Sequence, residues 1–252
     1  MKRTRICTAC LVLGLLVLSK SSSSQELQIH YDPRHSLDPA GNARNFVTLY
    51  FQYFRPAPDS ATTFVKPGSF LLKVQTDLNG ENNNMGKSYL QVSQSLRCWK
   101  PRIYLSLQYS GGLGVTEPKQ YSYYIVNTFS AGAEVPFRFK GAWLSSVLNF
   151  KWVPYARPSH DFLYTFYWWR GFFQYRLEFA GDFSIWTENK DHGDGTTPAD
   201  PGKRWYFFSE PQVWIHAGKY LALGSKINMY YHVNTNEDLL QAYPSLAVRV
   251  KW

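Results

Sequence analysis

The chain has 252 residues, of which 44% are apolar and 17% aromatic, and its formal net charge is +9 with a mean hydropathy of −0.34. After the first 24 residues no window approaches the ~18 consecutive apolar residues of a transmembrane helix, which excludes a helical membrane protein. Three cysteines exclude a disulfide-rich scaffold.

The N-terminus has the pattern of a secretory signal peptide. Three of the first five residues are basic, residues 10–18 form a short apolar run, and four serines follow at 21–24. A basic head, a short apolar centre and small residues are typical of an exported protein. We predict that residues 1–24 are the signal peptide and that the mature chain begins near Gln25.

Removing this leader changes two properties of the chain. Cys7 and Cys10 leave with it, so Cys98 has no cysteine partner within the mature chain. The leader also carries four basic residues, and the remaining 23 Lys and Arg exceed the 18 Asp and Glu by only five. The charge therefore does not predict a nucleic-acid polymer as a partner.

The mature chain alternates apolar and polar residues in one segment after another. In 45–54, for example, Val47, Leu49, Phe51 and Tyr53 share one face. A period of two predicts β-strands with two different neighbours. About twelve strands are predicted, at residues 27–32, 45–54, 68–78, 87–98, 102–110, 121–130, 139–152, 161–169, 172–187, 204–216, 219–232 and 245–252.

The connections between these strands alternate in length. Short ones, at Trp99-Lys100-Pro101, Arg170-Gly171 and Ala217-Gly218, fall on one side, and long polar ones, at 79–86, 188–203 and 234–238, fall on the other. Outer-membrane barrels have short turns at one end and long loops at the other. A long connection from Arg55 to Pro67 on the side of the short turns and one of intermediate length around Pro136 fit this alternation less well. The tryptophans, placed near strand ends, predict two interfacial belts.

An apolar strand face can cover a soluble core or meet lipid, and the connection lengths and tryptophans favour lipid. We therefore predict an all-β fold in which residues 25–252 form a closed antiparallel transmembrane β-barrel of about 12 strands in the bacterial outer membrane. Membrane lipid would contact its outer face, and a water-filled lumen would solvate its polar face.

The last strand resembles the C-terminal assembly signal of bacterial outer-membrane proteins. It places Leu246, Val248, Val250 and the terminal aromatic Trp252 at alternate positions. This resemblance implies that the barrel-assembly machinery is a partner.

Three segments are similar to the Tsx-like nucleoside-specific channel-forming family, in its branch of uncharacterised Bacteroidetes proteins. They are LQIHYD at 27–32, GDFSIWTEN at 181–189 and FSEPQVW at 208–214. The resemblance implies a monomeric barrel of about twelve strands through which small solutes diffuse. Gln212 stands where the channel pattern has a basic residue, so the nucleoside preference is implied less strongly than the architecture.

The polar faces supply the candidate solute-binding residues. Arg176, Glu178 and Asp182 share one face of one strand, and Glu210 comes from the next, so we expect these four side chains to meet. Pro211 removes a ladder donor and is expected to induce a bulge that pushes Glu210 inward. The complete predicted set is Arg176, Glu178, Asp182, Glu210, Lys226, Tyr104, Tyr206 and Tyr220.

These features predict a passive channel for small polar solutes, with nucleosides as candidates, and not an enzyme. Two alternatives stay open: a barrel closed by its own side chains with a structural or adhesive role, and an outer-membrane lipid hydrolase. His160 and His232 lie near the outer strand ends, but no hydrolase motif surrounds them. Residues 191–195 have the wrong spacing for a calcium loop, and no metal or cofactor is predicted.

Overall fold

The computed structural model describes residues 24–57, 65–97, 99, 102–116, 121–195, 197, 199–233 and 235–252. The predicted signal peptide, except for Ser24, and Cys98 lie outside the described residues. None of the helices in the described ranges is long and apolar enough to cross a membrane.

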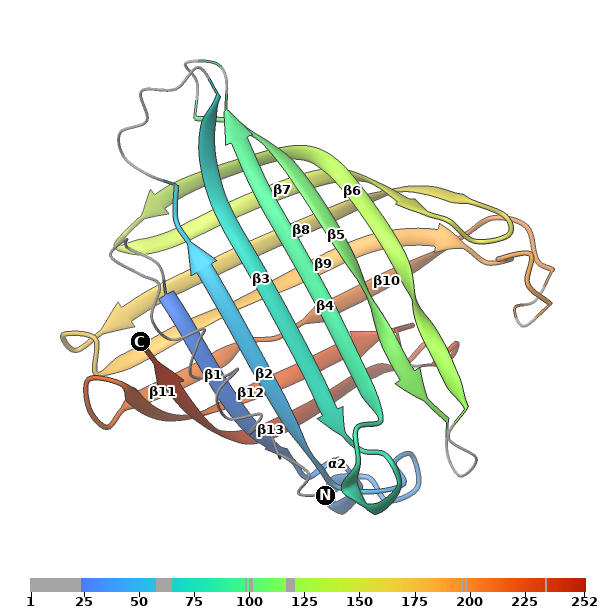
Figure 1. Ribbon diagram of the computed structural model, residues 1–252, viewed down its shortest axis with the longest axis horizontal. Helices are drawn as coiled ribbons and strands as arrows, with labels where there is room; N and C mark the ends of the chain where they lie inside the picture. Colours follow the sequence, from blue (N-terminus) through green and yellow to red (C-terminus); the bar gives the residue numbers. More distant parts are fainter. Residues whose placement is uncertain are drawn as a thin grey trace, which may run out of the picture.

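Strands make up almost all of the described chain (Figure 1). A short helix, α2 (Arg34–Leu37), and a 3-10 turn, η2 (Glu81–Asn83), lie in connections. The strands are β1 (Ser24–Asp32), β2 (Phe46–Arg55), β3 (Lys66–Leu78), β4 (Lys87–Arg97), β5 (Tyr104–Val115), β6 (Ser122–Phe139), β7 (Ala142–Val153), β8 (Ser159–Phe172), β9 (Leu177–Asn189), β10 (Lys203–Ser209), β11 (Gln212–His216), β12 (Leu221–Tyr231) and β13 (Leu240–Lys251).

The sheet closes on itself. Each strand pairs antiparallel with its neighbours, and β1 pairs with β13 from Glu26 opposite Lys251 to Tyr31 opposite Leu246. Strands β10 and β11 both pair with β9 and β12, so together they occupy one position in the wall. The prediction of an all-β closed antiparallel barrel of about 12 strands is confirmed. We call the end where Gln25 and Trp252 exchange backbone hydrogen bonds the near end, and the opposite end the far end.

The break between β10 and β11 keeps the register. On β9, Ser209 lies opposite Phe183 and Gln212 lies opposite Ala180, so two residues are skipped on each strand. The bulge expected at Pro211 is therefore wrong. Proline removes a ladder donor here without adding a residue, and side chains on both sides of the break keep the same facing.

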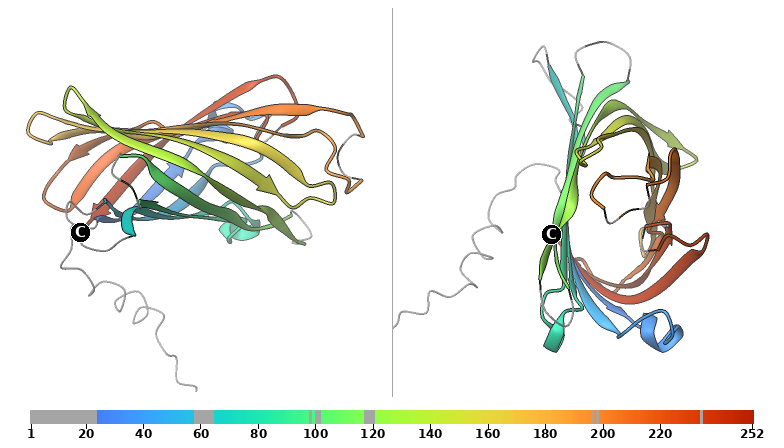
Figure 2. Two further views of the ribbon diagram at one scale, coloured as in Figure 1. Left: turned by 90° about the horizontal axis from the view of Figure 1, so that it is seen from above. Right: turned by 90° about the vertical axis from the view of Figure 1, so that its right-hand side faces the viewer.

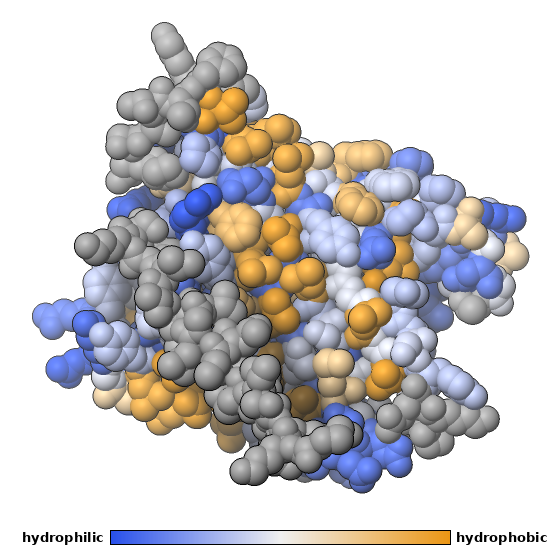
Figure 3. Space-filling view, in the orientation of Figure 1, coloured by the Kyte–Doolittle hydropathy of each residue, from blue (hydrophilic) through white to orange (hydrophobic). Residues whose placement is uncertain are grey.

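Alternation separates an apolar outside from a polar inside. On β1, Leu27, Ile29 and Tyr31 are 37–47% exposed, whereas Gln28 and His30 between them are at most 1% exposed. Apolar side chains gather over the middle of the outer surface (Figure 3). The end-on view in Figure 2 shows a closed outline in which β3–β5 form a flatter side facing the curve of the later strands.

Two turns at the near end differ from the predicted ones. The chain turns at 173–176 rather than at Arg170-Gly171, and Phe173 to Tyr175 adopt positive φ there. Strand β6 runs through Pro136 to a two-residue turn, Lys140-Gly141, with positive φ at both positions, so the expected intermediate connection is wrong. Such a turn matches the twist of a hairpin.

The predicted tryptophan belts are only partly present. Trp152 and Trp205 lie near the far end and are 37% and 55% exposed on the outer surface. Trp214 is fully buried inside the barrel, and Trp186 donates a hydrogen bond to the interior carboxylate of Glu188. Strand-end position alone does not determine which face an indole occupies.

The outer surface gives a first prediction. Leu246 lies in the middle of β13 and is 68% exposed. Leu246→Arg should lower the free energy of unfolding in lipid vesicles by about 2 to 4 kcal/mol, because a charge near the bilayer midplane is poorly solvated. Val250→Arg, near the strand end, should cost about 0 to 1 kcal/mol. Urea titration of the refolded variants measures both, and equal costs at the two positions would contradict a lipid-facing surface.

Candidate functional site

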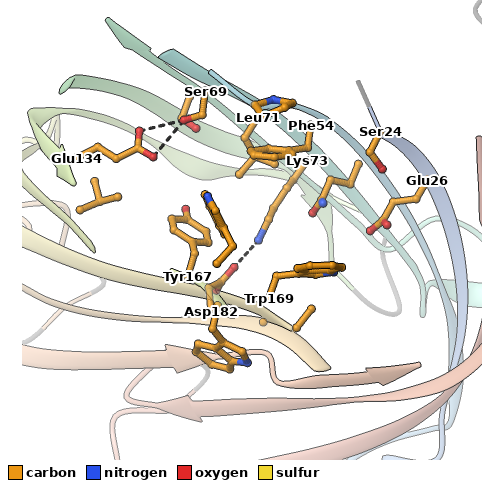
Figure 4. Close-up of a pocket in the computed structure, with 18 of the residues that line it drawn as sticks. Ser24, Glu26, Phe54, Ser69, Leu71, Lys73, Glu134, Tyr167, Trp169 and Asp182 are labelled. Atoms are coloured by element: carbon orange, nitrogen blue, oxygen red, sulfur yellow. Dashed lines mark hydrogen bonds and ion pairs between the residues drawn. The ribbon is translucent and has the colours of Figure 1, made fainter. Parts of the chain in front are cut away.

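The middle of the barrel is crossed by a lysine. Lys73 extends from β3, and its Nζ lies 2.6 Å from Asp182 Oδ2 on β9 and 2.9 Å from Glu210 Oε1 in the β10–β11 break. Strands β3 and β9 are six positions apart in either direction around the wall. These ion pairs therefore join opposite walls, and Figure 4 shows the lysine spanning the gap.

A second lysine completes this central cluster, which consists of Lys73, Asp182, Glu210 and Lys226. Lys226 Nζ lies 3.0 Å from Glu210 Oε2 and 4.7 Å from the centre of the Tyr50 ring. All four charged residues are at most 8% exposed. Two cations and two anions balance, as buried charges must, because an unpaired buried charge is strongly destabilising.

A separate ion-pair network lies closer to the near end. Arg249 binds Glu178 through two hydrogen bonds of 2.7 and 3.0 Å and lies over the Trp214 ring at 4.4 Å. Glu26 lies 3.7 Å from the same guanidinium, and His216 is 3.2 Å from Glu178. The bidentate geometry fixes the planes of both groups, which is why arginine suits this position.

A cavity of about 390 Å³ occupies the near half of the lumen. It runs from Ser24, Pro56 and Lys251 at the near end to Lys73 and Asp182 at its inner boundary. Figure 4 shows side chains from both walls pointing into it. Its other lining residues include Gln52, Phe54, Ser69, Ser95, Gln108, Glu134, Arg138, Trp143, Tyr167, Trp169, Glu178 and Arg249.

The far end has its own charged contacts. Lys151 pairs with Glu188, and Lys203 pairs with Asp161 at 2.8 Å. Tyr155, in the loop after β7, donates a hydrogen bond to Glu188, and burial beside this carboxylate raises the pKa of the Tyr155 phenol. The phenol therefore stays protonated and acts as a donor.

Six of the eight predicted binding residues face the lumen. Four of them are buried there: Glu178, Asp182, Glu210 and Lys226. The ring centre of Tyr104 lies 5.2 Å from Arg97 Cζ, and the ring of Tyr206 stacks on that of Trp186 with 5.4 Å between the ring centres. They do not form one site. Tyr104 and Glu178 lie toward the near end, Asp182, Glu210 and Lys226 belong to the central cluster, and Tyr206 lies toward the far end.

The other two predicted residues do not face the lumen. Arg176 is exposed in the 173–176 turn, and Tyr220 is 52% exposed just before β12. Both residues continue the alternation of a neighbouring strand, but they lie in turns, because β9 begins only at Leu177 and β12 only at Leu221. The expected meeting of Arg176, Glu178, Asp182 and Glu210 is therefore reduced to Asp182 and Glu210, which share Lys73.

The predicted binding set omits two residues that organise the interior, Lys73 and Arg249. Alternation places both on the polar face, but a period of two does not say which polar side chains meet across the barrel. The available signal was the charge balance. Inward-facing acids require inward-facing cations within reach.

A serine and a histidine meet inside the barrel, which bears on the hydrolase alternative. His30 Nδ1 lies 2.9 Å from Ser245 Oγ. These residues are 1% and 2% exposed, and the serine hydroxyl also donates to the Lys226 carbonyl oxygen at 3.0 Å. A nucleophile must be accessible to its substrate, and this hydroxyl is buried. The pair therefore does not support a hydrolase site.

A closed antiparallel sheet that is apolar outside and charged inside defines the class of membrane-spanning β-barrels. Residues 24–252 match the model of a family described as a domain of unknown function, DUF5020, and the chain belongs to this family.

The solved structures that are similar to the chain include LpxR and a porin. LpxR from Salmonella typhimurium has 10% sequence identity and a TM-score of 0.43, with 90% of this chain and 99% of that chain covered. The structure of a porin refined at 1.8 Å resolution has 8% identity and a TM-score of 0.39, with 91% and 99% covered. No curated protein matches the sequence.

The central cluster gives a second prediction. Lys73→Met removes the cation of Asp182, while Glu210 keeps Lys226, so the free energy of unfolding should fall by about 3 to 5 kcal/mol. Asp182→Asn in the Lys73→Met background should recover most of this loss, because it removes the stranded charge. Urea unfolding of the single and double variants measures the effect. A double variant as unstable as Lys73→Met would show that the ion pair is not the cause.

Proposed function

We propose that the protein is an outer-membrane channel that lets small polar solutes diffuse passively through a narrow central constriction. The contact between Lys73 and Asp182 is the observation that carries this proposal. At the level of this contact, flexible side chains and not backbone fill the lumen. A polar solute can replace one side chain's contacts with its own, which is how charged constrictions select and pass solutes.

The ends of the barrel support an orientation. The near end has the short turns 140–141, 173–176 and 217–220, and the far end has longer connections such as 190–202 and 232–239. The connection 56–65 is the exception, because it is long and lies at the near end. In bacterial outer-membrane barrels short turns face the periplasm and long loops face outward. We place the near end and its cavity on the periplasmic side and the far end on the cell surface.

The size of the cavity supports a small solute. Its volume of about 390 Å³ lies within the range of about 300 to 1,000 Å³ that is usual for small-molecule sites. Aromatic rings and charged groups share its wall, which suits a solute with a flat face and several polar groups. Nucleosides fit this description, and the Tsx-like resemblance supports including them in a solute panel.

The burial of the central cluster favours a second candidate, a barrel that its own side chains keep closed. Lys226 is 1% exposed and Glu210 is 3% exposed. Permanent ion pairs at this depth would brace the walls and leave no conducting path. Conductance separates this candidate from a channel.

The third prediction tests the constriction. The double variant Lys73→Ala/Asp182→Ala removes the cross-lumen contact without changing the net charge, and it should raise single-channel conductance in planar bilayers. Arg157→Ala/Asp191→Ala is the matched control, because this ion pair lies in far-end loops. Its conductance should equal that of the wild type.

Two outcomes would contradict the proposal. If neither the wild type nor Lys73→Ala/Asp182→Ala conducts, the closed barrel is favoured. A heat-dependent shift in electrophoretic mobility verifies that both proteins are folded. If the wild type and Lys73→Ala/Asp182→Ala conduct equally, the constriction lies elsewhere in the lumen.

A further inference from the structure

One carboxylate in the cavity has no cation. Glu134, on β6, is 8% exposed and lines the cavity. Its oxygens accept hydrogen bonds from Ser69 at 3.0 and 3.1 Å and from Ser145 at 2.9 Å. Within the described ranges no Lys, Arg or His lies within ion-pair distance of it. The other buried acids that line this cavity differ, because Asp182 pairs with Lys73, and Glu178 and Glu26 pair with Arg249.

The charge environment of Glu134 is therefore incomplete. Hydroxyl groups satisfy its oxygens as hydrogen-bond acceptors but supply no positive charge. Bonds from a charged donor to a carboxylate are roughly twice as strong as neutral ones. Arg138 and Lys251 also line the cavity, but neither forms an ion pair with Glu134, and the Cα atom of Arg138 lies four residues, or about 13 Å, further along an extended β6. A cation that entered the cavity would gain a partner that the chain does not provide.

Aromatic rings surround the same space. Tyr167, Trp169, Trp143 and Phe54 line the cavity, and Figure 4 shows Glu134, Tyr167 and Trp169 around it. Tyr167 lies directly opposite Ser145 in the sheet, and Ser145 is the residue whose hydroxyl bonds to Glu134. Aromatic faces attract organic cations. The lining therefore favours an organic cation over a hydrated metal ion.

The central cluster shows which cation the wall can hold. Lys73 carries a primary ammonium that lies between two carboxylates and 5.8 Å from the centre of the Tyr167 ring. On its other side, Tyr167 lies directly opposite Asp182. Glu134, Ser145, Tyr167 and Asp182 thus form one continuous row along the inner wall. An ammonium group bound at Glu134 would therefore lie in the same row of residues as the ammonium group of Lys73, which pairs with Asp182.

We infer that the cavity binds a solute carrying a primary ammonium group, which Glu134 holds as an ion pair beside the ring of Tyr167. This inference rests on the proposed function and names the solute class of the same lumen. Ammonium groups reach the constriction by exchanging Glu134 for Asp182 as their partner.

Tyramine and tyrosol test the inference, because the two molecules differ only in carrying an ammonium or a hydroxyl group. Isothermal titration of the detergent-solubilised wild type, with detergent alone as the blank, should give tyramine a Kd at least about tenfold lower than that of tyrosol. Glu134→Gln should bring the two Kd values within about twofold of each other. Glu237→Gln, an exposed loop variant with the same charge change, should keep the wild-type preference.

Several results would overturn the inference: equal Kd values for the wild type, no binding of either molecule, or a preference that survives Glu134→Gln. Even if Glu134→Gln does not fold, the wild-type comparison can overturn the inference, because equal Kd values would show that the cavity does not recognise the ammonium group. Bilayer conductance is recorded separately. A conducting barrel without amine preference refutes only this inference, and a silent barrel with Glu134-dependent amine binding refutes only the channel.

Discussion

The ion pair between Lys73 and Asp182 is the contact on which the interior depends. It joins two strands that are as far apart around the wall as a twelve-position ring allows. Both groups leave bulk water, so each is tolerable only with the other in place. Figure 2 shows β3–β5 as the flatter side of the barrel, and Lys73 reaches from β3 on this side to β9. The shape of the cross-section and the balance of buried charge therefore support each other.

The closed sheet makes this interior possible. In hydrocarbon every backbone N–H and C=O needs a partner, and a ring of strands supplies all of them without an edge. Apolar side chains then occupy the outside, and each strand has the inside for its polar residues. Lys226, Arg249 and Lys73 lie on the inner face because the outer face would leave their charges unsolvated.

The acids of the cavity and the central cluster divide into those that the chain neutralises and, within the described residues, one that has no ion-pair partner. Asp182 and Glu210 share two lysines, and Glu178 has Arg249. Glu134 has only hydroxyl donors and faces the cavity. Paired charges stabilise the wall, whereas an acid without a counter-charge is available to a cation that enters the cavity. Within the cavity and the central cluster, this difference separates the paired charges from the proposed binding group.

The alternation of residues by itself determined the strand content and the facing of most side chains, including Glu178, Asp182, Glu210 and Lys226. The closed all-β class followed from alternation together with the lengths of the connections. A period of two depends only on the neighbouring residues, so it can be read along one strand. It failed at Arg176 and Tyr220 because alternation continues into turns, where the side chains no longer face the lumen. Only the tertiary structure decided that Lys73 meets Asp182 and that Glu134 has no cation. Those facts depend on where each strand lies around the ring and how far apart the walls are, and no local pattern contains that distance.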